Sequence, residues 1–272
     1  MSFSGKRALI VGGSSGMGLQ AGSLLLKAGA SVTLVGSRKE KLDHAFKVLG
    51  ASDKLQAFQC DLRRDADVER LVNHVAEKMK DVKYLVNAAG VFSPKSFLGH
   101  TGGDYDAYMQ LNRATFFVTQ QVAKNMIANG GGAIVNVGSM WAHQAIKATP
   151  SSAYSMAKAG LHAFTQHLAM ELGDYNVRVN AVAPAVVETP IYEAFIAPGK
   201  VHETLQGSPH RPYRDSPGRG LCDRFSALGG GKLGDGCHLG RGRRGHGRKK
   251  PMSACLFDSS VKPSVPGRNG RY

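Results

Sequence analysis

The sequence predicts an α/β protein with a single doubly wound parallel sheet and helices on both faces. Two observations indicate this fold: six short apolar runs alternate with longer stretches of helical periodicity, and a glycine-rich turn joins the first run to the first helix. Alternation at this spacing is typical of βαβ units with right-handed crossovers. The 272 residues, 42% of them hydrophobic, suffice to bury a sizeable core.

The expected elements follow from the local pattern. The apolar runs are mostly continuous, which is typical of strands covered on both faces. Six buried strands are therefore expected, at residues 7–11, 31–35, 55–60, 84–87, 133–137 and 177–182. The helices expected between them span residues 16–28, 40–49, 65–79, 105–128 and 153–172.

A glycine-rich turn follows the first expected strand directly. Glycine lets the backbone turn tightly and approach a phosphate closely, and the free N–H groups at the start of the next helix complement its negative charge. Such turns also serve as simple connections, but this position between strand one and helix one favours nucleotide binding. The expected contacts are Gly12, Ser14, Ser15, Gly16, Met17 and Gly18.

The end of the second expected strand indicates which nucleotide is bound. A site for NAD would place a carboxylate there to hold the ribose 2′-hydroxyl. This chain has Ser37, Arg38 and Lys39 instead, with no acid to repel a 2′-phosphate and with basic groups to pair with it. The pattern therefore favours NADP(H) over NAD(H), and the alternative is a solvated basic helix start.

Further motifs follow in order along residues 5–195, each after an expected strand or on the next helix. They are Asp61-Leu62, Asn87-Ala88-Ala89-Gly90, Asn112, Ser139, Tyr154 with Lys158, and the segment that holds Pro184, Val187 and Thr189. With the glycine turn, this order resembles the classical short-chain dehydrogenase/reductase family, which has a Rossmann-type sheet. Two details depart from that pattern: Val11 stands where the family has Thr, and the segment between Ser139 and Tyr154 is slightly long.

The resemblance implies a role for each motif. Asp61 and Leu62 would contact the adenine, Asn87 to Gly90 would form a turn facing the cofactor, and Pro184, Val187 and Thr189 would lie near the nicotinamide. The catalytic group would be Asn112, Ser139, Tyr154 and Lys158. The expected substrate is a small-molecule carbonyl compound or secondary alcohol, a 3-oxoacyl thioester being one candidate.

The chemistry expected of these residues follows from hydride transfer to a carbonyl. Negative charge grows on the substrate oxygen, so a donor must meet it and supply a proton. Tyr154 is the expected acid; because a free phenol has a pKa of about 10, a neighbouring cation is needed, and Lys158 lies one helical turn away. Ser139 would polarise the carbonyl, and Lys158 would also bind the nicotinamide ribose. The family resemblance implies that Asn112 would anchor a water that links Lys158 to solvent.

Residues 207–272 differ from residues 1–206, which we expect to form the catalytic domain. The C-terminal segment holds 14 Lys and Arg against 4 Asp and no Glu, and so supplies +10 of the net charge of +15. It also has 14 of the 34 glycines and no apolar periodicity, so we expect it to be disordered. A seventh strand and a terminal Val-Asp-Gly-Gly turn, which the family has, are missing from its sequence.

We hypothesise that the chain from about residue 207 onward is a frameshifted translation. Read one base along, the codons of residues 228–247 can encode a strand followed by a Trp-Asp-Val-Asp-Gly-Gly turn. If the segment is real, the sixth strand becomes a bare sheet edge, and aggregation or poor substrate binding is expected. A homo-oligomer, a dimer or tetramer, is expected only where the missing strand is restored.

The leading expectation is thus an NADP(H)-dependent oxidoreductase. A cytoplasmic location is expected because the sequence shows no membrane span and no apolar signal core. One alternative is a nucleotide-binding regulatory protein that keeps the fold without catalysis. Another is a nucleic-acid binder that uses residues 241–250, which lack aromatic interleaving and any reader motif. The scattered Cys and His residues do not have the paired spacing of metal ligands, so no metal site is expected.

Overall fold

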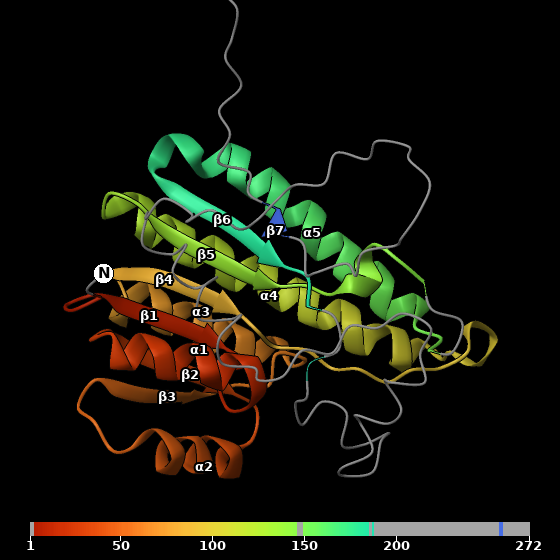
Figure 1. Cartoon of the computed structure of the whole chain (residues 1–272), viewed down its shortest axis with the longest axis horizontal. Coiled ribbons are helices and arrows are strands. Elements are labelled where there is room, and N and C mark those ends of the chain that lie inside the picture. The colour runs from red at the N-terminus through yellow and green to blue at the C-terminus, as the bar shows by residue number, and fades with distance from the viewer. Residues whose placement is uncertain (1–2, 146–148, 185–186, 188–255, 258–272) are drawn as a thin grey trace, which may run out of the picture.

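The computed structural model describes residues 3–145, 149–184, 187 and 256–257, which form one sheet flanked by helices (Figure 1). The parallel strands are β1 (Arg7–Val11), β2 (Ser31–Gly36), β3 (Leu55–Gln59), β4 (Val82–Asn87), β5 (Gly132–Val137) and β6 (Val177–Val182). The helices are α1 (Gly16–Lys27), α2 (Lys39–Leu49), α3 (Asp65–Lys78), α4 (Gly102–Ala128) and α5 (Ser152–Leu172). Short 3₁₀ turns are η1 (Phe97–Gly99), η2 (Met140–Ala142) and η3 (Gly173–Tyr175).

The strand order confirms the doubly wound fold. The parallel strands lie in the order β3-β2-β1-β4-β5-β6, so the chain reverses its direction of winding between β1 and β4. Ligands of such sheets bind beyond the carboxyl ends of the strands at this reversal point. The motif at the end of β1 therefore lies beside the one at the end of β4.

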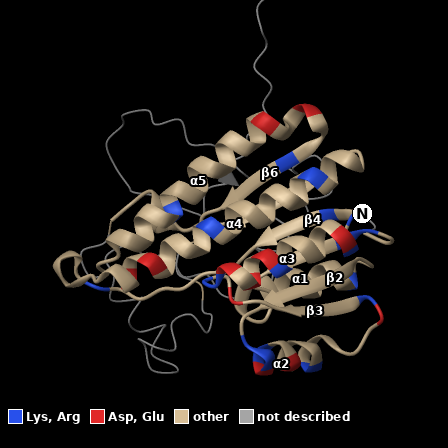
Figure 2. Cartoon of the chain, turned by 180° about the vertical axis from the view of Figure 1, so that it is seen from behind, with Lys and Arg blue, Asp and Glu red and all other residues tan. Residues whose placement is uncertain are grey.

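Helices cover both faces of the sheet (Figure 1). On one face α1 and α2 pack on a buried cluster that includes Ile10, Leu25 and Leu34. On the other face α3, α4 and α5 cover a cluster that includes Leu9, Leu71 and Val118. Figure 2 shows this second side, where α5 carries few charged residues. In the part of the chain described above, no helix has the length and apolar character needed to cross a membrane.

One strand does not match the sequence prediction. Strand β3 was expected to be buried on both faces, but most of its residues are exposed or half-buried and only Leu55 is buried. The reason is its place at the edge of the sheet, where it pairs with β2 alone. The expectation of six buried strands is wrong for this strand.

The far edge of the sheet also differs from expectation. Residues Leu256–Phe257 form a two-residue strand, β7, which pairs antiparallel with Ala181 and Val182 of β6. The sequence predicted no strand in residues 207–272. The rest of the C-terminal segment, and the site residue Thr189, lie outside the described residues.

Polar side chains cross the middle of the sheet. Asn87 on β4 and Asn136 on β5 are register partners, and Nδ2 of Asn87 donates to Oδ1 of Asn136 at 2.8 Å. The same Nδ2 donates to Oγ1 of Thr119 on α4, and Nδ2 of Asn136 donates to Oγ1 of Thr165 on α5. All four side chains are buried, so each hydrogen bond offsets the cost of removing an amide or hydroxyl from water.

Candidate active site

A cavity of about 650 Å³ lies at the carboxyl ends of β1, β2 and β4. Of the described residues expected to bind cofactor, six do not line this cavity: Gly18, Asn87, Tyr154, Lys158, Pro184 and Val187. The structure therefore brings together motifs that are far apart in the sequence. The predicted residues that line the cavity are Gly12, Ser14, Ser15, Gly16, Met17, Ser37, Arg38, Asp61, Leu62, Ala88, Ala89 and Gly90.

The glycine turn is so tight that two of its positions have no room for a side chain. Gly12 has a φ of 80°, and a Cβ there would lie 2.4 Å from the backbone nitrogen of Ala89. A Cβ on Gly18 would lie 2.2 Å from the carbonyl oxygen of Gly12. Glycine thus lets α1 start directly beneath the turn, with its free N–H groups near the cavity.

The charges of the cavity wall suit a phosphorylated ligand. Arg38 is the N-cap residue of α2, and Arg38, Lys41 and Arg63 all line the cavity. Among the described residues of the wall, the one carboxylate is that of Asp61, which accepts from Nε and Nη2 of Arg63 at 3.0 and 2.8 Å. Hydrogen bonding to Arg63 lowers the pKa of Asp61. The lining residues therefore fit a dinucleotide, with a surplus of positive charge for its phosphates.

The basic residues after β2 differ in whether they reach this wall. Lys39 does not line the cavity, because its Nζ pairs with Oδ2 of Asp43 one turn along α2 at 2.8 Å. Lys41 lines the cavity in its place. The first turn of a helix turns successive side chains by 100°, so residues 39 and 41 face in different directions.

A second, smaller cavity of about 20 Å³ adjoins the first and shares the lining residues Ala89, Gly90, Val91 and Leu111 with it. Asn112, Tyr154 and Lys158 line it, so three of the four predicted catalytic residues meet there. Its volume is enough for about one water molecule. The fourth residue, Ser139, is 3% exposed and caps η2 at the end of β5, where its Oγ accepts from the backbone N–H of Trp141.

Hydrogen bonds fix two of these side chains. Nζ of Lys158 donates to the carbonyl oxygen of Val137 at 2.7 Å and lies 5.9 Å from the ring centroid of Tyr154. Nδ2 of Asn112 donates to the carbonyl oxygen of Ala157 at 2.8 Å, which joins α4 to α5. Helix α5 holds one other charged residue, Glu171 near its end, so Lys158 is the single Lys or Arg of this helix.

Burial is the largest cause of the pKa shifts of Lys158 and Tyr154. It lowers the pKa of Lys158 to about 8. Burial also raises the pKa of Tyr154, against a hydrogen bond from Ser139 that lowers it, and the nearby Tyr108 raises it further. Lys158 is not among the causes of this shift, so its role in making the tyrosinate accessible stays a prediction. Tyr154 keeps its proton at neutral pH, as a proton donor must.

Sequence reasoning missed three residues around this group. The rings of Phe92 and Tyr108 contact that of Tyr154 with centroid separations of 5.0 and 5.8 Å, both edge to face. His162, one turn beyond Lys158, is 5% exposed and packs against Gly138, next to Ser139. The spacing of four between Tyr108 and Asn112 was the one signal in the sequence, because it places both on one helix face.

Comparisons with known proteins agree with this geometry. The profile of the short chain dehydrogenase family matches residues 6–198. The 3alpha-hydroxysteroid dehydrogenase of Mediterraneibacter gnavus is 35% identical over 199 residues, which are 71% of this chain and 78% of that protein. The 3-oxoacyl-[acyl-carrier-protein] reductase FabG of Thermotoga maritima is 34% identical over 207 residues, which are 75% of this chain and 82% of that one.

Solved structures extend the comparison. The Pseudomonas aeruginosa RhlG/NADP active-site complex superposes with a TM-score of 0.73 at 27% identity, covering 84% of this chain and 90% of that one. A Burkholderia cenocepacia gluconate 5-dehydrogenase in complex with NADP and tartrate gives a TM-score of 0.71 at 25% identity, over 84% and 89%. From its sheet, its glycine turn and these matches, the chain belongs to the short-chain dehydrogenase family and is an NAD(P)-dependent oxidoreductase of carbonyl and alcohol groups.

Proposed function

We propose that the protein reduces a ketone to a secondary alcohol with NADPH, and catalyses the reverse reaction with NADP. The observation that carries this is the meeting of Asn112, Tyr154 and Lys158 at one small cavity beside the larger, positively charged one. In this function the nicotinamide supplies or accepts the hydride. Every other task falls to side chains of this chain.

The proton transfer is assigned to Tyr154. Its raised pKa keeps the phenol protonated at neutral pH, so it can donate to the substrate oxygen as negative charge develops there. Ser139, hydrogen-bonded to Tyr154, orients the same oxygen. Lys158 has a pKa of about 8 and can return a proton to the phenol, while Asn112 holds α5 in place through Ala157 and can hold a water in the small cavity.

The experiment is steady-state kinetics with NADPH and a panel of ketones, including a 3-oxoacyl thioester. Tyr154→Phe is expected to lower kcat by more than about a hundredfold while leaving NADPH binding intact. Tyr175→Phe is the control, since Tyr175 is an exposed tyrosine after α5. Full turnover by Tyr154→Phe would exclude this mechanism and leave the nucleotide-binding regulatory alternative.

The preference for NADP over NAD is assigned to Arg38 and Lys41. Both line the large cavity, near the end of β2 where the ribose of the adenosine half would bind, and neither faces an unpaired acid in the cavity wall. We expect Arg38→Ala and Lys41→Ala each to lower the ratio of kcat/KM for NADPH over NADH by about tenfold. Lys39→Ala is the matched control, because Lys39 pairs with Asp43 outside the cavity. An unchanged ratio in the first two variants would refute the assignment.

The contact residues are proposed together with this function. We assign dinucleotide binding to the cavity residues named above, with Gly18, Asn87, Pro184, Val187 and Thr189. We also propose that residues 1–206 are the catalytic domain, that the enzyme is cytoplasmic, and that residues from about 207 onward are frameshifted. Sequencing the transcript across codons 195–272 tests the last point: a missing or extra base near codon 207 would support it, and an intact frame would refute it.

The assembly is proposed to follow from the reading frame. A restored C-terminal strand would cover the outer edge of β6 along its length and permit a dimer or tetramer. In the chain as written, the described part of the C-terminal segment pairs with this edge at Ala181 and Val182 alone. Light scattering on the chain as written should therefore report aggregation or a monomer. A soluble tetramer of that chain would contradict this proposal.

A further inference from the structure

Three residues on one face of α4 each make a different contact. Asp104, Tyr108 and Asn112 follow one another at intervals of four, which stacks them along the helix. Oδ2 of Asp104 accepts from Nζ of Lys95 at 2.6 Å and from both the backbone N–H and the hydroxyl of Thr101. Asn112 binds the backbone of α5, as described above. Tyr108 lies between the anchored start of the helix and the catalytic group.

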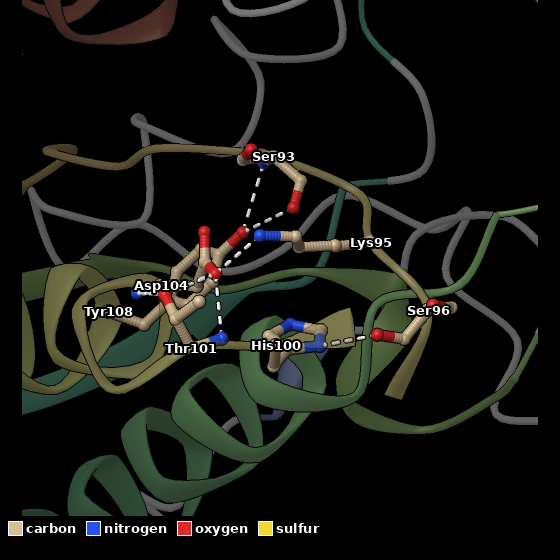
Figure 3. A network of polar contacts seen from close by, with 7 residues as sticks. All are labelled: Ser93, Lys95, Ser96, His100, Thr101, Asp104 and Tyr108. Carbon is tan, nitrogen blue, oxygen red and sulfur yellow. Dashed lines mark hydrogen bonds and ion pairs between the residues drawn. The ribbon is translucent and has the colours of Figure 1, made fainter. Parts of the chain in front are cut away.

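Both hydrogen bonds of Tyr108 go to a single residue of the loop between β4 and α4 (Figure 3). Its hydroxyl accepts from the backbone N–H of Ser93 at 3.0 Å and donates to the carbonyl oxygen of Ser93 at 3.0 Å. Tyr108 is 5% exposed, whereas Ser93 is exposed, so the two hydrogen bonds are part-buried. One phenol thus fixes the backbone of the loop at the residue that follows Phe92.

The ring of Tyr108 contacts the proposed acid. It meets the ring of Tyr154 at a centroid separation of 5.8 Å and an interplanar angle of 67°, an edge-to-face arrangement. The neighbour of Ser93, Phe92, meets the same Tyr154 ring at 5.0 Å and 73°. The hydroxyl of Tyr108 and its ring therefore act on the same target, since the loop that the hydroxyl holds carries the second aromatic contact to Tyr154.

The same loop reaches the segment before α5. The backbone N–H of Lys95 donates to the carbonyl oxygen of Pro150 at 3.0 Å, and α5 begins at Ser152. Loop residues 91–95 are therefore held at Ser93 by Tyr108, at Lys95 by Asp104 and by Pro150. Displacement of the loop at Ser93 would move Phe92 away from the Tyr154 ring.

We propose that Tyr108 is a positioning residue, which holds the Tyr154 ring by an edge contact and by fixing the loop that carries Phe92. This inference rests on the proposed role of Tyr154 as the proton donor. In this role Tyr108 makes no contact with cofactor or substrate. Its effect is on where the acid points and on the loop whose residues Val91 and Phe92 line the large cavity, and so it sets both kcat and KM.

Two substitutions separate the two parts of this role. Tyr108→Phe keeps the ring and removes both hydrogen bonds to Ser93, so the loop and Phe92 shift, KM for the ketone should rise about tenfold and kcat should fall about threefold. Tyr108→Leu also removes the aromatic edge, so kcat should fall about tenfold in addition. The control is Tyr105→Phe, because Tyr105 is an exposed tyrosine on the same helix.

The assay uses the full chain, NADPH and two ketone probes, ethyl acetoacetate and the rigid trans-1-decalone. Circular dichroism and thermal melting accompany the kinetics, so a purely structural effect is detected as a lower Tm with unchanged kcat and KM at low temperature. That result would overturn the proposal, as would unchanged kinetics in both Tyr108 variants. If Tyr108→Leu fails to fold, Tyr108→Phe tests the proposal alone: a raised KM supports it, and an unchanged KM overturns it.

A readout without cofactor or substrate comes from tyrosine ionisation. The ultraviolet difference between wild type and Tyr154→Phe isolates the titration of Tyr154, whose titratable neighbours in the described chain are Tyr108 on α4 and Lys158 on α5. In the Tyr108→Leu background this titration should move to lower pH by about half a unit or more, because water reaches the phenol. No movement would overturn the proposal.

Failure of the proposal and failure of the proposed function give different results. If Tyr154→Phe keeps its turnover, the proposed function fails whatever the Tyr108 variants do. If Tyr154→Phe is inactive and the Tyr108 variants behave as wild type, only the positioning role of Tyr108 fails.

Discussion

Replacing His162 should remove a large part of the acid sensitivity of this protein. The imidazole lies on α5, buried against Gly138 and edge to face with the ring of His143 at 4.6 Å. Burial, with the nearby charges of His143 and Lys158, lowers the pKa of His162 from 6.5 to about 4. The folded state therefore keeps His162 neutral at pH values where the unfolded chain already binds a proton there.

The sign and size of the effect follow from this difference. Because the pKa is lower in the folded state, the free energy of unfolding falls as the pH drops through 6.5 and levels off below about 4. The loss is about 2 kcal/mol at about pH 5 relative to pH 8, and it approaches about 3 kcal/mol at lower pH. His162→Gln does not titrate in this range and should lose the dependence.

The assay is urea unfolding followed by the fluorescence of Trp141, the single tryptophan of the chain. Unfolding free energies at about pH 5 and pH 8 are compared between wild type and His162→Gln, with His167→Gln on the exposed side of α5 as the control. His74 also has a lowered pKa from burial, so some dependence should remain in the variant. The same pH dependence in wild type and His162→Gln would refute the reasoning.

Three further outcomes are expected. Gly18→Ala should weaken NADPH binding by about a hundredfold in a fluorescence titration, because its Cβ would lie 2.2 Å from the Gly12 carbonyl oxygen, and Gly102→Ala, whose Cβ would meet nothing within 4 Å, should not. Asn136→Leu should lower the free energy of unfolding by about 3 kcal/mol in urea, because its buried partners lose their hydrogen bonds. Asp104→Asn should speed amide hydrogen exchange in the first turn of α4 about tenfold, since the capping box with Thr101 is weakened; unchanged exchange would contradict this.

Much of the fold was predictable because its signals are local. The apolar runs and the glycine turn placed all six parallel strands and five helices to within three residues. The largest difference, the start of α4 at Gly102 instead of Tyr105, comes from Thr101 and Asp104, which form a capping box. The exposure of β3 depends on its edge position, which only the strand order reveals.

The site was predictable where one motif follows one strand, and not where contacts join distant segments. Arg38 and Asp61 come directly after strands β2 and β3, so the topology brings both to the large cavity. The contact of Tyr108 with Tyr154 joins two helices, and its hydrogen bonds to Ser93 use backbone atoms that leave no mark on the sequence. That Lys41 lines the large cavity while Lys39 pairs with Asp43 also depends on side-chain placement, which the order of residues does not reveal.

The buried asparagine pair also bears on how the sheet selects its alignment during folding. Asn87 and Asn136 stand opposite each other on the neighbouring inner strands β4 and β5. A slip of one residue between these strands would turn one amide to the other face and set each against hydrocarbon with no partner. Apolar side chains of similar size would tolerate that slip far better, so the two amides favour a single alignment of β4 and β5. That alignment sets the position of the turn after β4, which lines both cavities, relative to the residues that follow β5.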